Sequence, residues 1–240
     1  LVALLRDPHP GVQAAAVDAA IKAPDPALPV VLAELLAHRR LGRRVRVALA
    51  AQGDLAVPVL ARILDDRRVD VGTRVQVPRV LREIATPEAV RAMLYSNKDD
   101  DAYLRYVIIE ELGRIRRRHP HTTFERAHTE AAAVRRLVAY ASYRPIAADL
   151  AAAPAEYGLL HRAVHDRMRQ NLEAGLRVLG LLHDPQTMEN VHAGLLREEP
   201  AARSDALEVL DVAMEGSDVR AAVIAQVEPP TPAGDPGRAQ

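Results

Sequence analysis

The sequence contains no cysteine, no tryptophan and a single phenylalanine among its 240 residues. Without cysteine the chain has no disulfide framework, no thiolate zinc site and no thiol nucleophile. This absence fits a reducing cytosol, although many proteins of oxidising compartments also lack cysteine. Glycine is scarce as well, with 12 residues, and this composition favours helices whose backbones pack closely.

The chain also lacks an excess of either charge, because Lys+Arg and Asp+Glu both number 32. A dedicated nucleic-acid-binding protein is expected to carry a basic excess, so we predict no nucleic-acid partner. No uninterrupted apolar run approaches the ~18 residues of a membrane span, and no signal peptide is visible. The chain begins at Leu1, inside a helical pattern and without methionine, so we expect a fragment whose upstream part is missing.

What the sequence does contain is a repeat with a period near thirty residues. Its clearest copy, Asp99–Ile115, reads DDDAYLRYVIIEELGRI: an acidic turn, a leucine and an arginine, then an apolar helical stripe. Similar stretches occur at Asp7–Ile21, Leu41–Gly53 and Asp70–Ala85. The slot of the arginine is then filled by four residues in steps of 30, 31 and 31, namely Gln13, Arg43, Arg74 and Arg105.

A period near thirty that holds two helices is typical of an α-solenoid. We therefore predict an all-α fold, an α-α superhelix of about five helix pairs. The first helix of each complete pair has an early proline, at Pro29, Pro58 and Pro87. The second helices are expected at Leu41–Gln52, Val71–Ala85 and Ala102–Arg118. Pro78 should bend the middle one, because its ring removes an intrahelical hydrogen bond.

A change of pattern interrupts the repeats. Two long helices, Ala131–Asp149 and Leu159–Leu182, are interpreted as an inserted helical hairpin. Arg203 then resumes the arginine slot 98 residues after Arg105, close to three periods, so the hairpin replaces repeats without losing the phase. The predicted organisation is HEAT-like repeats over 1–122, the hairpin over 123–183, closing repeats over 184–227, and a disordered Pro/Gly-rich tail over 228–240.

The acidic turn, the Val/Leu-Arg pair and the Ala/Leu-rich second helix resemble HEAT repeats, including their lyase-type HEAT-like class. Gln170–Met188 (QNLEAGLRVLGLLHDPQTM), with Arg203 and Ala206–Asp211 (ALEVLD), is more specifically similar to one kind of HEAT region. That region is the cytoplasmic C-terminal part of some bacterial transporters of the major-facilitator or ATP/ADP-translocase-like type. His183 and Asp205 depart from the pattern, where an aromatic residue and asparagine are expected.

This resemblance implies a non-catalytic interaction or regulatory module, the cytosolic portion of a bacterial membrane transporter. It places the chain in the cytoplasm at the inner face of the cytoplasmic membrane, as part of a larger protein. The implied partner is another protein or the missing membrane domain. No cofactor is implied. The alternative is a HEAT-fold enzyme or nucleic-acid-processing protein, DNA-glycosylase-like or lyase-like, for which we find no catalytic set of residues.

An arginine-rich stretch is the first candidate surface, and its members are Arg39, Arg40, Arg43, Arg44 and Arg46. These side chains could bind phosphates or anionic lipid headgroups. In the other interpretation, which we favour, Arg43 occupies the repeat slot and pairs with the acidic turn of a neighbouring repeat. The remaining arginines are then solvated.

The hairpin carries a second candidate surface. All seven aromatic residues of the chain fall between Tyr95 and Tyr157, and three of them, Tyr140, Tyr143 and Tyr157, lie in the hairpin. Tyrosine is enriched at interface anchors, because one end is apolar and the other forms hydrogen bonds. These three residues either contact a partner or fill the gap where the hairpin meets the repeats, and we favour the second interpretation.

His161 and His165 are four residues apart and share a helical face, as a pair of metal ligands would. Zinc proteases, however, place a glutamate directly after the first histidine, and here Arg162 follows. No third ligand is evident in the sequence. We therefore predict no metal site and no cofactor.

Overall fold

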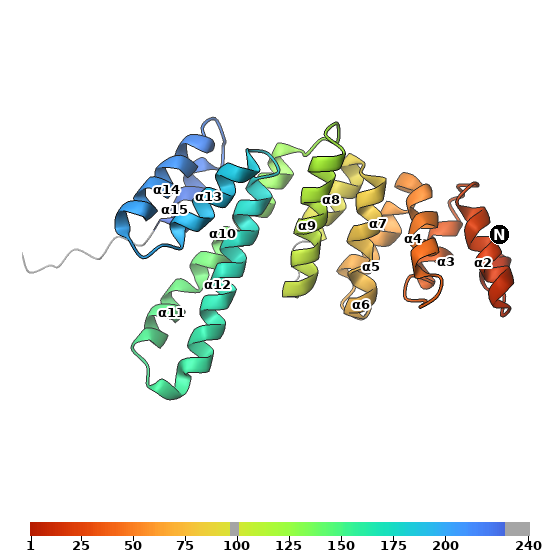
Figure 1. Ribbon diagram of the computed structural model, residues 1–240, viewed down its shortest axis with the longest axis horizontal. Coiled ribbons are helices and arrows are strands. Elements are labelled where there is room, and N and C mark those ends of the chain that lie inside the picture. The colour runs from red at the N-terminus through yellow and green to blue at the C-terminus, as the bar shows by residue number, and fades with distance from the viewer. Residues whose placement is uncertain (97–100, 229–240) are drawn as a thin grey trace, which may run out of the picture. The chain divides into compact units, whose positions relative to one another are not determined.

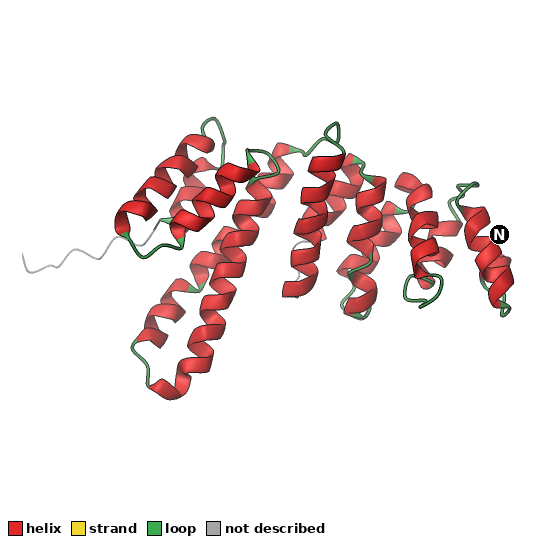
Figure 2. Cartoon of the chain, viewed as in Figure 1, coloured by secondary structure: helices red, strands yellow, loops and turns green. Residues whose placement is uncertain are grey.

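The computed structural model describes residues 1–96 and 101–228, and every regular element in these ranges is a helix (Figures 1 and 2). Because these ranges contain no strand, the predicted all-α class is confirmed. The chain divides into two compact units, of which unit 1 comprises Leu1–Ala132 and Arg177–Leu182. Unit 2 comprises Ala133–Leu176 and the residues from His183 onward. The predicted hairpin, 123–183, therefore contributes to both units.

The first nine α-helices of the chain belong to unit 1. They are α1 (Val2–Leu5), α2 (Pro10–Ala20), α3 (Leu28–Glu34), α4 (Gly42–Ala51), α5 (Val57–Asp65), α6 (Val71–Arg74), α7 (Val77–Ile84), α8 (Pro87–Ser96) and α9 (Ala102–Arg118), with the 3-10 helix η1 (Gly53–Leu55). The remaining helices are α10 (Arg126–Ser142), α11 (Arg144–Ala151), α12 (Gly158–Leu179), α13 (Pro185–Leu195), α14 (Pro200–Ala213) and α15 (Arg220–Val227), with η2 (Ala155–Tyr157). Of the predicted tail, 228–240, only Glu228 is among the described residues.

Two series of helices pack against each other in unit 1 (Figure 1). Helices α1, α3, α5 and α8 contact one another in chain order, and so do α2, α4, α7 and α9. We call the first series the A helices and the second the B helices. Each A helix also contacts a B helix: α1 contacts α2, α3 contacts α4, α5 contacts α7 and α8 contacts α9. The predicted pairing of an A helix with a B helix therefore describes the local packing.

Fully buried leucines from both series form the core of unit 1. Leu32 and Leu60 come from A helices, and Leu49, Leu81 and Leu112 come from B helices, all with no exposed surface. Burying such a side chain contributes about 1.5–3 kcal/mol. The apolar stripes that the repeat predicted are thus the surfaces along which the two series meet.

Two helices that were predicted to be continuous are broken before a proline. Pro78 is the second residue of α7, and the turn at Val75 and Gln76 separates α7 from α6. Pro145 is the second residue of α11, which begins one residue after Tyr143, so the predicted helix Ala131–Asp149 is wrong. Proline has no N–H and its ring clashes with the carbonyl four residues earlier, so it is tolerated only in the first turn.

The arginine slot is the fourth residue of α2, of α6 (the short helix before α7) and of α9. Gln13 Nε2 donates a hydrogen bond to the Leu5 carbonyl (3.0 Å), at the end of α1. Arg74 donates from Nε (3.0 Å) and Nη2 (2.6 Å) to the Leu64 carbonyl near the end of α5. Arg105 holds the same helical position in α9 and is buried. The side chains of Gln13 and Arg74 satisfy carbonyls that the end of an A helix leaves without an intrahelical partner.

Arg203 extends this arrangement to unit 2 and Arg43 departs from it. Arg203 is the fourth residue of α14, and its Nε donates to the Arg197 carbonyl (2.6 Å). Helix α4, however, begins at Gly42, after His38 has bonded the backbone N–H groups of Leu41 and Gly42. Arg43 is therefore the second residue of its helix and exposed, and fully buried Val45 occupies the fourth position.

We expect Arg74→Met to lower the free energy of unfolding by about 2 kcal/mol, because the buried Leu64 carbonyl would lose its partner. Arg43→Met, in contrast, should change it by less than about 0.5 kcal/mol, since Arg43 is exposed. Urea unfolding followed by circular dichroism compares the two variants with the parent chain. Equal losses in both variants would contradict the assignment of the slot.

Candidate functional site

Ion pairs join neighbouring helices in unit 1. Arg44 on α4 lies 3.4 Å from Asp18 on α2. Arg82 on α7 lies 2.9 Å from Glu111 on α9, which also accepts a 2.7 Å hydrogen bond from Arg114. Farther along the same unit, Arg177 lies 3.0 Å from Glu110. Arg44, Arg82 and Arg177 are therefore each matched by a carboxylate on another helix.

Three arginines between these pairs are an exception, and we call Arg43, Arg46 and Arg79 the arginine cluster. Arg46 Nη1 on α4 and Arg79 Nη1 on α7 donate to the same atom, the amide oxygen Oε1 of Gln76, at 3.0 and 3.2 Å. Gln76 in turn donates from Nε2 to the Gly72 carbonyl (3.3 Å). Within residues 1–96 and 101–228, no carboxylate lies within salt-bridge distance of the three guanidinium groups.

The positive charges of the arginine cluster repel one another. Burial, followed by the positive charges of three neighbouring arginines, lowers the pKa of Arg46 below its usual value. A neutral amide oxygen orients the two guanidinium groups but does not cancel their charge. An anion placed here would meet several preorientated N–H donors, and charge-assisted hydrogen bonds are about twice as strong as neutral ones. The arrangement can therefore hold a carboxylate or a phosphate.

The five arginines of the arginine-rich stretch thus have different environments in the structure. Arg39 and Arg40 are exposed in the turn between α3 and α4, Arg44 is paired with Asp18, and Arg43 and Arg46 belong to the cluster. The predicted contact of Arg43 with an acidic turn is wrong, because no carboxylate of the described chain reaches it. Sequence reasoning missed Arg79 and Gln76, which come from the next helix pair, about one period farther along.

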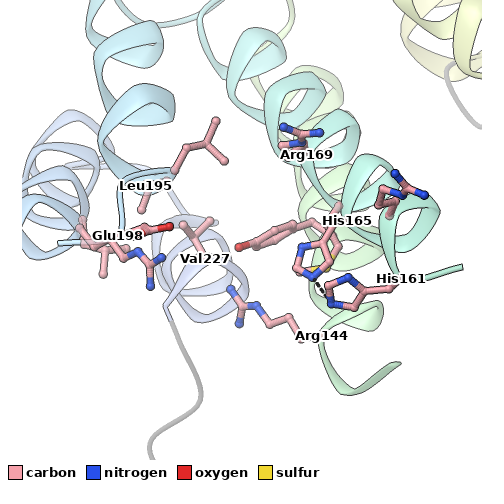
Figure 3. Close-up of a pocket in the computed structure, with 13 residues that line it drawn as sticks. Arg144, His161, His165, Arg169, Leu195, Glu198 and Val227 are labelled. Atoms are coloured by element: carbon pink, nitrogen blue, oxygen red, sulfur yellow. Dashed lines mark hydrogen bonds between the residues drawn. The ribbon is translucent and has the colours of Figure 1, made fainter. Parts of the chain in front are cut away.

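Unit 2 contains a cavity of about 780 Å³, within the range of small-molecule sites (Figure 3). Helices α10 and α11 contribute Tyr140 and Arg144, and α12 contributes a row that includes His161 and His165. Its other wall comes from the α13–α14 region and the end of α15. The full lining is Tyr140, Arg144, His161, Arg162, His165, Met168, Arg169, Leu195, Leu196, Glu198, Arg203, Leu207 and Val227.

The tyrosines predicted as a partner surface are not grouped together. Tyr140 lines the cavity of unit 2, and the guanidinium of Arg144 lies 4.8 Å from its ring centroid. Tyr143 stands at the break between α10 and α11, where its carbonyl accepts from the Ala147 N–H (2.9 Å). Tyr157 lies in η2 and is 46% exposed. Tyr140 therefore belongs to the lining of this cavity, and Tyr143 and Tyr157 do not.

The two histidines of α12 point toward each other, as their spacing indicates. Their Nε2 atoms are 3.2 Å apart, which allows one hydrogen bond between the rings (Figure 3). The described residues contain no group of three or more His, Cys, Asp or Glu side chains that could hold a metal ion. The pair is instead surrounded by arginines, which add donors and positive charge to the cavity.

Comparison with known proteins adds no family to these observations. Searched against protein families the chain matches none, and no curated protein is similar to it in sequence. Among the described helices, none is by itself both long and apolar enough to cross a membrane. The segments Gly42–Ala51 and Gly53–Asp65 reach that criterion only jointly, across a bend of 113°.

Proposed function

We propose that this chain is a non-catalytic interaction module, a HEAT-like α-solenoid whose arginine cluster binds an acidic segment of a partner protein. The observation that carries the proposal is the arginine cluster itself, in which two half-buried guanidinium groups share one neutral amide oxygen. The stacked A and B helices of unit 1 support the solenoid part of the proposal. Stacked repeats present extended surfaces, and binding is their usual use.

Uncompensated charge supports a binding role for this surface. Like charges on one helix face destabilise a fold, and here they are retained beside well-paired neighbours such as Arg82 and Glu111. Residues that cost stability without an internal partner are expected where a surface serves function. The cluster therefore fits an external anion better than it fits a structural role.

An acidic protein segment suits the site because the cations are accompanied by an apolar side chain. Val47 follows Arg43 by four residues on α4, on the same helix face, and is 50% exposed. Neighbouring helix axes lie about 8–10 Å apart, so carboxylates on one partner segment can reach arginines of both α4 and α7. Complementary charge with an apolar contact is typical of a protein interface.

We expect a fluorescent twelve-residue peptide of alternating Glu and Leu to bind the parent chain, measured by fluorescence anisotropy. The double variant Arg46→Gln/Arg79→Gln should bind at least about tenfold more weakly, because two charge-assisted hydrogen bonds are lost. Arg39→Gln/Arg40→Gln removes the same charge from the exposed α3–α4 turn and should change affinity by less than about threefold.

Stability provides a second measurement on the same variants. Because Arg46→Gln removes a charge that is crowded by like charges, we expect its free energy of unfolding to be unchanged or raised by about 0.3–0.5 kcal/mol. Weaker binding with retained stability separates a binding site from a structural one. Equal loss of peptide binding in both double variants, or tighter binding to anionic phosphatidylglycerol vesicles than to the peptide, would overturn the proposal.

The proposed setting is the cytosolic side of a bacterial membrane transporter, and its support is the resemblance of Gln170–Met188 to such transporters. In that setting the acidic segment belongs to the transporter or to a regulatory protein. Reading the coding sequence upstream of Leu1 tests this part: a segment with several membrane spans supports it, and a start codon shortly before Leu1 rejects it. The arginine cluster can bind an acidic partner in either case.

A further inference from the structure

The cavity of unit 2 combines oriented cations with an apolar wall, and it is separate from the arginine cluster of unit 1. Figure 3 shows Arg144 beside His161 and His165 at one end of the cavity and Leu195 on the opposite side. A site with one cationic end and one apolar side differs from a simple anion site. It also differs from an ordinary apolar cavity.

Arg144 is held in the cavity by three contacts. Its Nη1 donates to the Glu228 carbonyl (2.7 Å) and its Nη2 to the Gln226 carbonyl (2.5 Å), at the end of α15. The guanidinium also lies over the ring of Tyr140, 4.8 Å from the centroid. These partners fix the orientation of Arg144, but all of them are uncharged. Its positive charge therefore remains available to an anion in the cavity.

The rest of the lining leaves a positive excess. Arg169 is paired with Asp166 on the same helix. Arg162 and Arg203 have no carboxylate partner within the described parts of the chain, and Glu198 is the one acidic residue of the lining. With Arg144, three guanidinium groups without a carboxylate partner share the lining with one carboxylate.

The wall formed by the α13–α14 region and the end of α15 is mainly apolar, and its two charged residues are Glu198 and Arg203. Leu195, Leu207 and Val227 line it together with Leu196, which is 45% exposed, and Met168 adds an apolar side chain from α12. Water against this wall gains no hydrogen bonds from it, and covering apolar surface is worth roughly 25 cal/mol per Å². An anion without an apolar body would leave the wall wet, and a neutral apolar molecule would leave the arginines without a counter-charge.

We propose that this cavity binds an anionic amphiphile of the fatty-acid class, a carboxylate on an unbranched alkyl chain. The carboxylate lies against Arg144 and the one ring N–H that the hydrogen bond between His161 and His165 leaves free. The alkyl chain lies along Leu195, Leu196 and Leu207. This activity goes beyond the proposed binding of an acidic protein segment and rests on different residues.

Isothermal titration of the whole chain with octanoate, with acetate and with 1-octanol tests both halves of the proposal. Octanoate should give saturable binding below about 5 mM, and each of the other two probes should bind at least about tenfold more weakly. Histidine signals in NMR spectra should shift with octanoate at His161 and His165. The proposal would be overturned if octanol or acetate bound with the same affinity as octanoate. It would also be overturned if octanoate binding saturated without shifting the histidine signals.

Variants locate the site. Leu196→Asp places a negative charge on the exposed apolar wall and should weaken octanoate binding at least tenfold, while Val212→Asp serves as the matched control. Val212 lies on α14 outside the cavity and is 64% exposed. Arg144→Gln should likewise weaken binding tenfold or more, with folding checked by circular dichroism.

The control from unit 1 keeps the two binding proposals apart. Arg46→Gln/Arg79→Gln should leave octanoate binding unchanged, because both residues belong to the other unit. Equal effects of Leu196→Asp and Val212→Asp would reject the cavity as the site. Loss of octanoate binding in Arg46→Gln/Arg79→Gln would do the same and assign the anion to the arginine cluster.

Discussion

Replacing Glu111 by alanine is expected to lower the free energy of unfolding by about 3 kcal/mol. The side chain of Glu111 is 3% exposed and accepts hydrogen bonds from Arg82 (2.9 Å) and Arg114 (2.7 Å). Breaking a buried ion pair costs about 3–5 kcal/mol, because the remaining charge is left without its partner. Arg82 keeps a second partner, Glu83, so we expect the lower end of that range.

Glu83→Ala is the matched control for this prediction. Glu83 contacts the same guanidinium, that of Arg82, but its own side chain is 53% exposed. An exposed ion pair contributes about 0–1 kcal/mol, so this variant should lose no more than that. Thermal unfolding would show the difference as a fall in the midpoint of about 6–12 °C for Glu111→Ala, at ~2–4 °C per kcal/mol for a chain of this size.

A double replacement tests whether the loss comes from stranded charge. Because an apolar pair can replace a buried ion pair at little cost, Glu111→Leu combined with Arg82→Met should lose less than the sum of the single losses. Strictly additive losses would contradict the coupling between α7 and α9. A loss for Glu111→Ala no larger than that for Glu83→Ala would contradict the role of burial.

The sequence predicted the helical class and the arginine slot because both depend on local pattern. Gln13, Arg74 and Arg105 are each the fourth residue of a helix, and the side chains of Gln13 and Arg74 reach a carbonyl at the end of the preceding A helix. The assignment of Arg43 to the slot was wrong because it assumed a constant repeat length, whereas the turn before the B helix varies in length. His38 sets the start of α4, and that start moves the slot to Val45.

The arginine cluster and the cavity, for which we propose binding, could not be predicted because their residues meet only in the folded chain. The partners of Arg46 in the cluster are Gln76 and Arg79, about thirty residues away. An arginine on the exposed face of two successive B helices is the signal that could have found them. The cavity of unit 2 is even harder to predict from the sequence, because Tyr140 and Val227 belong to helices that are far apart in the sequence.

Replacing Gly194 by valine should destabilise unit 2 by about 2–3 kcal/mol. A Cβ atom at Gly194 on α13 would lie 2.7 Å from the Cβ of Ala206 and 3.3 Å from the Ala202 carbonyl oxygen, both on α14. Neither atom can rotate away, because one is fixed to the backbone and the other is part of it. The two helices would therefore have to move apart.

Ala193→Val controls for helix propensity, since Ala193 is the exposed neighbour of Gly194 and should lose only about 0.5 kcal/mol. Adding Ala206→Gly to Gly194→Val removes one of the clashing atoms and should recover part of the stability. Urea unfolding of the three variants measures these differences. If Gly194→Val and Ala193→Val lose the same amount, the close approach of α13 and α14 is contradicted.

The same close approach sets one wall of the cavity in unit 2. Leu195 and Leu196 directly follow Gly194, and Leu207 directly follows Ala206, so moving α13 away from α14 would also shift these three leucines. Gly194→Val should therefore weaken octanoate binding even under conditions where the chain stays folded. Ala193→Val should bind octanoate like the parent chain, because it leaves the packing of the two helices unchanged. Unaltered octanoate binding by folded Gly194→Val would show that the alkyl chain does not lie along this wall.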